Sequence, residues 1–262
     1  MIFIIGDLKM YRFFVNKNQI SEKTVTITGT DFNHIKNVLR MKIGEEVSVM
    51  IETGDNEDDG NEYRCEIAGY AEDEVLCNIL FVKKSDVELP CNITLFQALP
   101  KSDKMELIIQ KAVELGVKEI VPVATKRAVV KLDGAKEDKK ISRWMGISEA
   151  AAKQAKRAVI PTVTPVKSYK EAIDYCKDYD VKLIPYELSD PDSMSNTRKL
   201  ISEIKPGQKI AIFIGPEGGF TEEEIERAEE AGVVPITLGH RILRTETAGF
   251  TVLSWLVLML DN

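Results

Sequence analysis

The chain has 262 residues, of which 44% are hydrophobic, and a formal net charge of −7. This size and composition suit one large or two ordinary globular domains. The apolar run FTVLSWLVLML near the C-terminus is too short to span a bilayer, and MIFIIGDLKM has no signal-peptide cleavage site. The sequence therefore predicts a cytoplasmic protein without a membrane anchor.

Cysteine and histidine spacing gives no sign of a metal site. The four cysteines form no C-x-x-C pair, and the two histidines lie far apart in sequence. Zinc ligands normally come in such close pairs. We therefore expect no metal, and reduced thiols rather than disulfides.

The first third of the chain is rich in short β segments. TVTITG, EVSVMIE, YRCEIAGY and EVLCNILFV are separated by turn signals and by one helix-like stretch, DFNHIKNVLR. We expect a small barrel-like β domain over residues 1–85, with the acidic segment Glu52 to Glu62 as a solvated loop. The domain boundary is expected between Ser85 and Pro90.

After Pro90, apolar runs alternate with helical patterns. Five short segments have the apolar composition of buried strands, and segments with helical spacing separate most of them. They are NITLFQAL, EIVPVA, VKLIPY, KIAIFIG and VVPITL. This alternation predicts an α/β domain over residues 90–262, with a parallel sheet covered by helices on both faces. Ligands of such sheets bind beyond the carboxyl ends of the strands, so the loops there are candidate sites.

The first candidate loop, Pro100 to Asp103, precedes a helix with regularly spaced apolar residues. Asp103 and Glu106 are placed as a capping box at its start. Lys104 and Lys111 share the polar side of this helix, and Lys101 lies just before it. These three lysines could bind phosphates or merely keep a surface helix soluble, and the pattern does not decide between the two.

Basic charge is concentrated in one part of the sequence. Residues 101–157 hold 14 basic and 8 acidic residues, whereas residues 1–89 hold 10 basic and 17 acidic ones. A local basic surface can bind a structured RNA even on an acidic protein. An ordinary solvated face is an equal alternative on charge alone.

The second candidate loop, GPEGGFTEEE, lies between an apolar run and an acidic helix start. Thr221 and Glu224 form a capping box, so the helix is expected to begin at Glu222. The glycines permit close approach of a ligand, but Glu217 would repel phosphate, and the spacing fits neither a dinucleotide loop nor a P-loop. S-adenosylmethionine suits such a loop, because it has a sulfonium, an ammonium and no phosphate. A simple connecting turn is the alternative.

The third candidate loop is LGHRILRTETAG, Leu238 to Gly249. It places two arginines and the polar run Thr245 to Thr247 at the start of an otherwise apolar helix. This is more charge than helix capping requires, which favours a functional role.

Together these motifs resemble those of a known family. IGPEGGFTEEE followed by LGHRILRTETA is similar to the signature of SPOUT-class RNA methyltransferases, specifically of those that methylate N3 of a uridine in small-subunit (16S) ribosomal RNA. HIKNVLRM, LPKSDKMELIIQKAVELGV and SEAAAKQAKRAVIP are similar to the same family. The similarity begins at Met10, so residues 1–9 would be an extension, and His240 and Ala155 depart from the usual residues.

The resemblance implies a fold, a cofactor and a partner. It implies a PUA-like β-barrel that helps to bind RNA, an α/β SPOUT domain with a trefoil knot, and a homodimer. It also implies S-adenosylmethionine as the cofactor, bound by two loops. The cofactor-binding residues carried over are Gly215, Glu217, Gly218, Gly219, Leu238, Gly239, Ile242, Leu243, Thr245 and Ala248.

The expected chemistry sets the remaining candidates. N3 of uridine is a weak acid, so an enzyme must assist its deprotonation and stabilise the anion. We expect Arg244 to stabilise this anion, and Glu246 to orient Arg244 or take the proton, unless Glu246 is only a helix-start residue. The candidate phosphate contacts are Arg12, Arg40, Lys101, Lys104, Arg127 and Arg157.

Two other functions remain open. The chain could be an RNA-binding factor of ribosome assembly that keeps the fold without methyl transfer. It could also be a methyltransferase of the same class that acts on another RNA, such as transfer RNA, because the motifs of the knot are shared across the class.

Overall fold

The computed structural model describes residues 10–52, 60–130, 132, 134–186 and 193–261. The chain divides into two compact units, Met1–Glu88 with Lys156–Ile160, and Leu89–Ala155 with Pro161–Asn262. The predicted extension at residues 1–9 and most of the predicted acidic loop lie outside the described residues.

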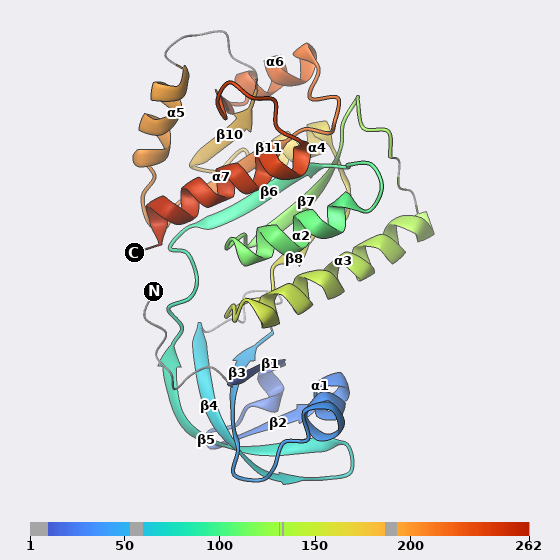
Figure 1. Ribbon diagram of the computed structural model, residues 1–262, viewed down its shortest axis with the longest axis vertical. Coiled ribbons are helices and arrows are strands. Elements are labelled where there is room, and N and C mark those ends of the chain that lie inside the picture. The colour runs from blue at the N-terminus through green and yellow to red at the C-terminus, as the bar shows by residue number, and fades with distance from the viewer. Residues whose placement is uncertain (1–9, 53–59, 131, 133, 187–192, 262) are drawn as a thin grey trace. The chain divides into compact units, whose positions relative to one another are not determined.

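A curled five-stranded sheet forms the first unit (Figure 1). Its order is β1-β3-β4-β5-β2, in which β1 and β3 are parallel and the other pairs are antiparallel. The bounds are β1 Tyr11–Val15, β2 Thr24–Thr28, β3 Glu46–Ile51, β4 Asn61–Tyr70 and β5 Glu74–Lys84. Alternation in TVTIT buries Val25 and Ile27. The β-strand pattern did not reveal β1, because YRFFV buries three consecutive residues, Phe13 to Val15, and so lacks the alternation of a half-buried strand.

The helix-like stretch predicted in this unit is helical. It forms α1 (Gly29–Asn33) and the π-helical turn η2 (His34–Leu39), and a shorter 3-10 turn, η1 (Lys17–Gln19), precedes β2. The segment ends at Arg40, which has a left-handed backbone with φ of 53°. Such a residue ends a helix sharply and turns the chain toward β3.

The second unit contains the predicted parallel sheet. Its order is β12-β10-β11-β6-β7-β8, with β9 also paired to β7, and every pair is parallel. The bounds are β6 Asn92–Ala98, β7 Glu119–Ala124, β8 Thr162–Val163, β9 Lys167–Ser168, β10 Val181–Pro185, β11 Lys209–Ile214 and β12 Val234–Ile236. Near-continuous burial of β6 and β11 explains why their sequences do not alternate between apolar and polar residues as half-buried strands do.

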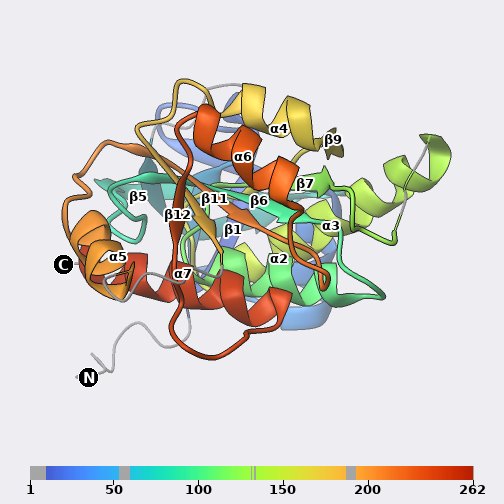
Figure 2. The same cartoon turned by 90° about the horizontal axis from the view of Figure 1, so that it is seen from above.

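Helices cover both faces of this sheet, as the sequence predicts. Figure 2 shows α4 and α6 on one face and α2 and α7 on the other. The bounds are α2 Lys104–Glu114, α3 Gly134–Gln154, α4 Tyr169–Tyr175, α5 Ser193–Ser202, α6 Glu222–Glu230 and α7 Thr245–Leu260. The apolar periodicity did not reveal the short helices α4 and α5.

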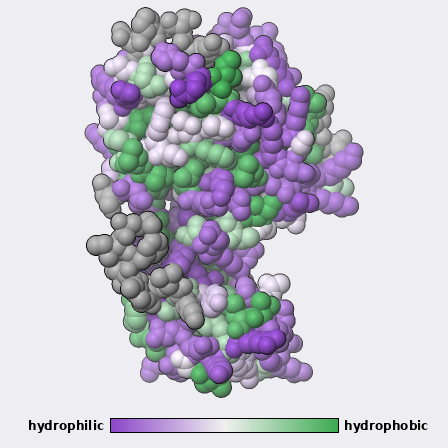
Figure 3. All heavy atoms as spheres, viewed as in Figure 1, coloured by the Kyte–Doolittle hydropathy of each residue, from purple (hydrophilic) through white to green (hydrophobic). Residues whose placement is uncertain are grey.

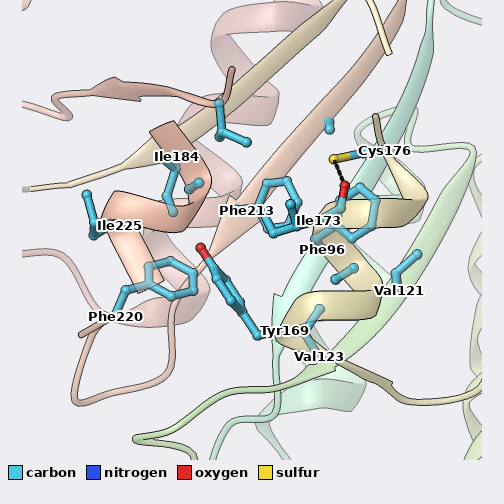
Figure 4. Close-up of a cluster of buried hydrophobic side chains, with 14 residues drawn as sticks. Phe96, Val121, Val123, Tyr169, Ile173, Cys176, Ile184, Phe213, Phe220 and Ile225 are labelled. Carbon is cyan, nitrogen blue, oxygen red and sulfur yellow. Dashed lines mark hydrogen bonds between the residues drawn. The ribbon is translucent and has the colours of Figure 1, made fainter. Parts of the chain in front are cut away.

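An aromatic core lies beneath α4 and α6 (Figure 4). The rings of Phe96 and Phe213 stack with centroids 4.5 Å apart, and Tyr169 lies 5.7 Å from Phe220. Phe220 is buried, and the Tyr169 hydroxyl donates a hydrogen bond of 2.6 Å to the backbone oxygen of Glu224. The turn after β11 is therefore anchored at its far end by the core.

One predicted capping box is confirmed and the other is wrong. At α6, the side chain of Thr221 accepts from the backbone N–H of Glu224, and the Glu224 carboxylate accepts from that of Thr221. At α2, Asp103 makes no side-chain cap bond, and Glu106 binds Arg143 instead, at 2.8 Å. The backbone of Asp103, with φ −93° and ψ 16°, is not in the extended conformation that capping requires.

Candidate functional site

The three candidate loops meet at one edge of the parallel sheet. β11 pairs with β6, and Ile214 lies opposite Gln97 near the carboxyl ends of both strands. The loop Pro100 to Asp103 follows β6, and the turn Gly215 to Thr221 follows β11. The first residue of α7, Thr245, bonds to both strand ends, so the third loop closes on the same place.

A buried hydrogen-bond chain joins these strand ends to α7. The Thr245 hydroxyl donates to the backbone oxygen of Gly215 at 2.6 Å and accepts from Nε2 of Gln97 at 3.0 Å. Thr245 is predicted to close the cofactor site, and here it fixes the turn that would bind the cofactor. Sequence reasoning missed Gln97, although an amide between apolar residues near the end of the strand NITLFQAL was an available signal.

Glu217 is the centre of an ionic cluster. Its carboxylate accepts from the backbone N–H of Lys101 at 3.1 Å and from Nζ of Lys104 at 3.0 Å. Lys104 Nζ also lies 3.5 Å from Oε2 of Glu246. Burial raises the pKa of the Glu217 carboxyl, but the bonds from Lys104 and Lys101 outweigh it, and the net effect is a lowered pKa. The pKa of Lys104 is raised, chiefly by its hydrogen bond to Glu217.

This cluster has an excess of negative charge, because two carboxylates surround one ammonium. A phosphate would be repelled here, whereas a ligand with a net positive charge would be attracted. The cluster therefore explains how a carboxylate can stand inside a glycine-rich turn.

Arg127 braces the same turn. Its Nη1 donates to the backbone oxygens of Gly218 at 2.9 Å and Phe220 at 3.0 Å. Between these two carbonyls, Gly219 takes a φ of +68°, which side chains rarely tolerate. The predicted phosphate contact at Arg127 thus has a structural bond to the cofactor turn, and the residue remains exposed.

The loop after β12 is more open. Gly239 has a φ of +100°, and its N–H donates to the Thr237 hydroxyl at 3.2 Å. Leu238, Leu243 and Ala248 are partly buried, but the side chain of Ile242 is 94% exposed. Any contact that Ile242 makes with an adenine would therefore be through its backbone or would need the loop to move.

The two predicted catalytic residues do not pair with each other. Arg244 is exposed at the N-cap of α7, and Glu246 is in the first turn of that helix. Among the described residues, the ion pair of Glu246 is with Lys104. The structure therefore brings Glu246 to the turn Gly215 to Thr221, and leaves Arg244 facing solvent beside that turn.

The candidate phosphate contacts fall into two groups. Lys101 and Arg40 are exposed. Arg157 is only 4% exposed, and its guanidinium binds the Glu88 carboxylate with an Nε distance of 3.0 Å. Arg12 donates to Glu62 at 3.2 Å and to the backbone oxygen of Arg157. The last two arginines have structural bonds within the first unit, which a phosphate would have to displace.

In the part of the chain that the structure describes, no group of three or more acidic, cysteine or histidine side chains could hold a metal ion. No described helix is both long and apolar enough to cross a bilayer. All four cysteines are buried and free.

A curled β unit and a parallel α/β unit with a cation-attracting turn define a protein of the α/β class with an additional small β domain. Family comparison makes this specific: a model described as RNA methyltransferase domain matches residues 87–257, and one described as RNA methyltransferase PUA domain matches residues 27–80. The chain belongs to this RNA methyltransferase family, and its fold is the PUA-like and SPOUT combination that the sequence predicts.

Individual relatives cover almost the whole chain. A protein of Bacillus subtilis (strain 168) named ribosomal RNA small subunit methyltransferase E is 39% identical over 249 residues, which is 94% of this chain and 95% of that protein. One of the same name from Mesomycoplasma hyopneumoniae is 36% identical over 94% of this chain and 98% of that protein. A crystal structure of the enzyme so named from Neisseria gonorrhoeae, bound to S-adenosylmethionine, has a TM-score of 0.79 at 32% identity, covering 96% and 98% of the two chains.

Proposed function

We propose that this protein is an S-adenosylmethionine-dependent enzyme that methylates N3 of a uridine in the 16S ribosomal RNA of the small subunit. The observation that carries the proposal is the cluster of Glu217, Lys104 and Glu246 at the glycine-rich turn. The names of full-length relatives agree with it. A ribosomal RNA substrate would also put the protein in the cytoplasm.

The residues at the turn fit this cofactor. S-adenosylmethionine carries a net positive charge, which the negative excess at Glu217 and Glu246 attracts. The backbone of Gly215, Gly218 and Gly219 is held from within the chain, so it would need little rearrangement on binding. The second loop, at Leu238, Gly239, Ile242 and Leu243, would form the other wall, with Thr245 and Ala248 between the two.

Bound S-adenosylmethionine supplies a methyl group on a positively charged sulfur. The chain must then remove the N3 proton of the uridine and stabilise the anion that remains. Arg244 is exposed beside the turn, where its guanidinium can donate charge-assisted hydrogen bonds to the uracil oxygens. Glu246 is ionically bound at the turn and is the candidate acceptor of the proton.

Two domains divide the work in this proposal. Residues 90–262 form the methyltransferase domain, and residues 1–85 form the domain that helps to bind RNA. Arg40 and Lys101 are exposed, so their side chains are candidate phosphate contacts, and Arg127 could serve both the turn and the RNA.

A homodimer and a knot complete the proposed architecture. Figure 3 shows apolar side chains among polar ones on the face that carries α2 and α7. Leu107 of α2 is 44% exposed, and Leu258 and Met259 of α7 are 79% and 47% exposed. Such residues would suit a partner subunit. The return of α7 to the ends of β6 and β11, through Thr245, supports a threaded C-terminal segment.

The test is methyl transfer to small subunits isolated from a host strain that lacks the gene. The purified protein and S-adenosylmethionine should produce N3-methyluridine, detected by mass spectrometry of 16S nucleosides and mapped to one position. A protein that binds the cofactor and the subunit but leaves uridine unmodified would instead be an assembly factor. Methylation of transfer RNA in preference to the subunit would reassign the substrate.

The role of Arg244 is tested in the same assay. Arg244→Ala should lower turnover at saturating cofactor by about 100-fold, because a positioned donor to the developing anion is lost. Arg198→Ala, a change of the same charge on the exposed face of α5, is the control. Near-normal turnover of Arg244→Ala would remove this residue from the mechanism.

A further inference from the structure

Lys104 joins two carboxylates that come from distant parts of the sequence. It is the first residue of α2, whereas Glu217 lies in the turn after β11 and Glu246 in the first turn of α7. Its Nζ is 3.0 Å from Glu217 and 3.5 Å from Glu246. The three side chains are 26%, 27% and 16% exposed, so the bridge is partly shielded from solvent.

Glu246 depends on this bridge. Its Oε2 is buried and has no hydrogen-bond partner among the described residues. A buried carboxylate oxygen is costly unless a charge compensates it, and Lys104 Nζ is the cation that faces it. Arg244, two residues earlier, is exposed at the helix N-cap and does not supply this compensation.

We propose that Lys104 is a positioning residue for methyl transfer, which holds Glu246 against the cofactor turn by binding Glu246 and Glu217 together. This inference rests on the proposed function and deepens it. It differs from the phosphate contact that the sequence predicts for Lys104, because the ammonium is directed to two carboxylates of the site.

The bridge works because the two carboxylates repel each other. Lys104 offsets that repulsion, and without it Glu246 would turn toward solvent and away from the turn. The pKa of Lys104 is raised, chiefly by its hydrogen bond to Glu217, because that bond stabilises the charged ammonium. The turn itself has other supports, in Thr245 and Arg127.

The test compares Lys104→Met, Lys104→Arg and Lys199→Met. The first removes the charge, the second keeps it, and the third removes a lysine charge outside the site, on α5, where Lys199 pairs with Glu203. Lys104→Met should lower kcat on unmethylated small subunits by about 30-fold, with the KM for subunits changed by less than about twofold. Lys104→Arg should recover most of kcat, and Lys199→Met should match the wild type.

A double variant identifies the residue through which Lys104 acts. In a Glu246→Gln background, adding Lys104→Met should lower kcat by less than about twofold further, because the carboxylate that Lys104 positions is already lost. Calorimetry should give an S-adenosylmethionine affinity within about threefold of wild type for Lys104→Met, because the turn keeps its other supports. If the loss of kcat in the double variant equals the product of the two single losses, Lys104 does not act through Glu246. A large loss of cofactor affinity in Lys104→Met would also overturn the positioning role.

Three further outcomes distinguish a failure of the positioning role from a failure of the proposed methyltransferase function. A raised KM with unchanged kcat, together with a weaker salt dependence of subunit binding, would make Lys104 a phosphate contact. If the wild type and Lys104→Met methylate the subunit equally well, only the positioning role of Lys104 is rejected. A wild type that forms no N3-methyluridine rejects both the function and this role.

Discussion

The two units each contain an ionic cluster, and the clusters are built in opposite ways. In the first unit a single carboxylate, Glu62, lies among three cations and is 4% exposed. In the second unit a single cation, Lys104, lies between two carboxylates and is 26% exposed. Burial makes the first cluster important for stability, whereas partial exposure leaves the second free to serve a ligand.

The contacts of Glu62 support a role of its cluster in the stability of the first unit. Glu62 accepts from the Ser48 hydroxyl at 2.8 Å and pairs with Arg12 and Arg64, both at 3.2 Å. Lys83 lies 3.5 Å away at the rim. These contacts join β1, β3, β4 and β5, so the cluster spans four of the five strands.

The largest expected effect on stability is at Glu62. Glu62→Gln keeps the shape and a hydrogen-bond acceptor for Ser48 but leaves the surrounding cations uncompensated. We expect a loss of about 3 kcal/mol in the free energy of unfolding of the first unit, measured by urea denaturation. Glu66→Gln, on the same strand, should change it by less than about 0.5 kcal/mol. Equal effects of the two changes would contradict a special role for the buried carboxylate.

Thr245→Val should have the next largest effect. It removes the hydroxyl between Gly215 and Gln97 and leaves a buried carbonyl oxygen without that donor. We expect a loss of about 2 kcal/mol in unfolding free energy, together with weaker cofactor binding by calorimetry. Thr245→Ser, which keeps the hydroxyl, should recover the binding, and failure to do so would show that the methyl group matters more.

Arg127→Met should have a smaller effect. It removes two hydrogen bonds from an exposed guanidinium to the turn, which we expect to cost about 1 kcal/mol in unfolding free energy. Cofactor affinity should fall while the salt dependence of RNA binding stays unchanged. A flatter salt dependence with normal cofactor affinity would instead make Arg127 a phosphate contact.

The smallest effect should be the pH dependence of the Lys104 bridge. The pKa of Glu217 is lowered in the folded chain, so its contribution is complete above the ordinary value of 4.5 and is lost as pH falls through the lowered one. The pKa of Lys104 is raised, so its contribution is complete below 10.5 and is lost as pH rises through the raised value. The difference in Tm between wild type and Lys104→Met should therefore be small and constant from about pH 6 to pH 9. A difference that varies strongly within that range would contradict these assignments.

Local patterns predicted the parts of the fold that depend on near neighbours. The capping box of Thr221 and Glu224 was readable because its partners are three residues apart, and the buried face of α2 because its residues repeat with the helix. The prediction of a capping box at Asp103 is wrong, because a spacing pattern does not show the local backbone conformation.

The site depends on contacts that sequence spacing does not reveal. Nothing in AAAKQAKR shows that Arg157 will bind Glu88, 69 positions earlier. Likewise, the motif containing Glu246 does not show that its partner is Lys104 rather than a neighbouring arginine. The resemblance to a family directed attention to three loops that the structure brings to one edge of the sheet, but the pairing of charges within them required the structure.

The hydrogen bond between Gln97 and Thr245 also has a consequence for synthesis of the protein. Its partners are 148 positions apart, and the turn at Gly215 receives its bond from the same threonine. A nascent or truncated chain without α7 would therefore keep the bonds of Arg127 to the turn but lack the bond to Gly215. The end of the turn next to β11 would be fixed only when α7 packs against the sheet.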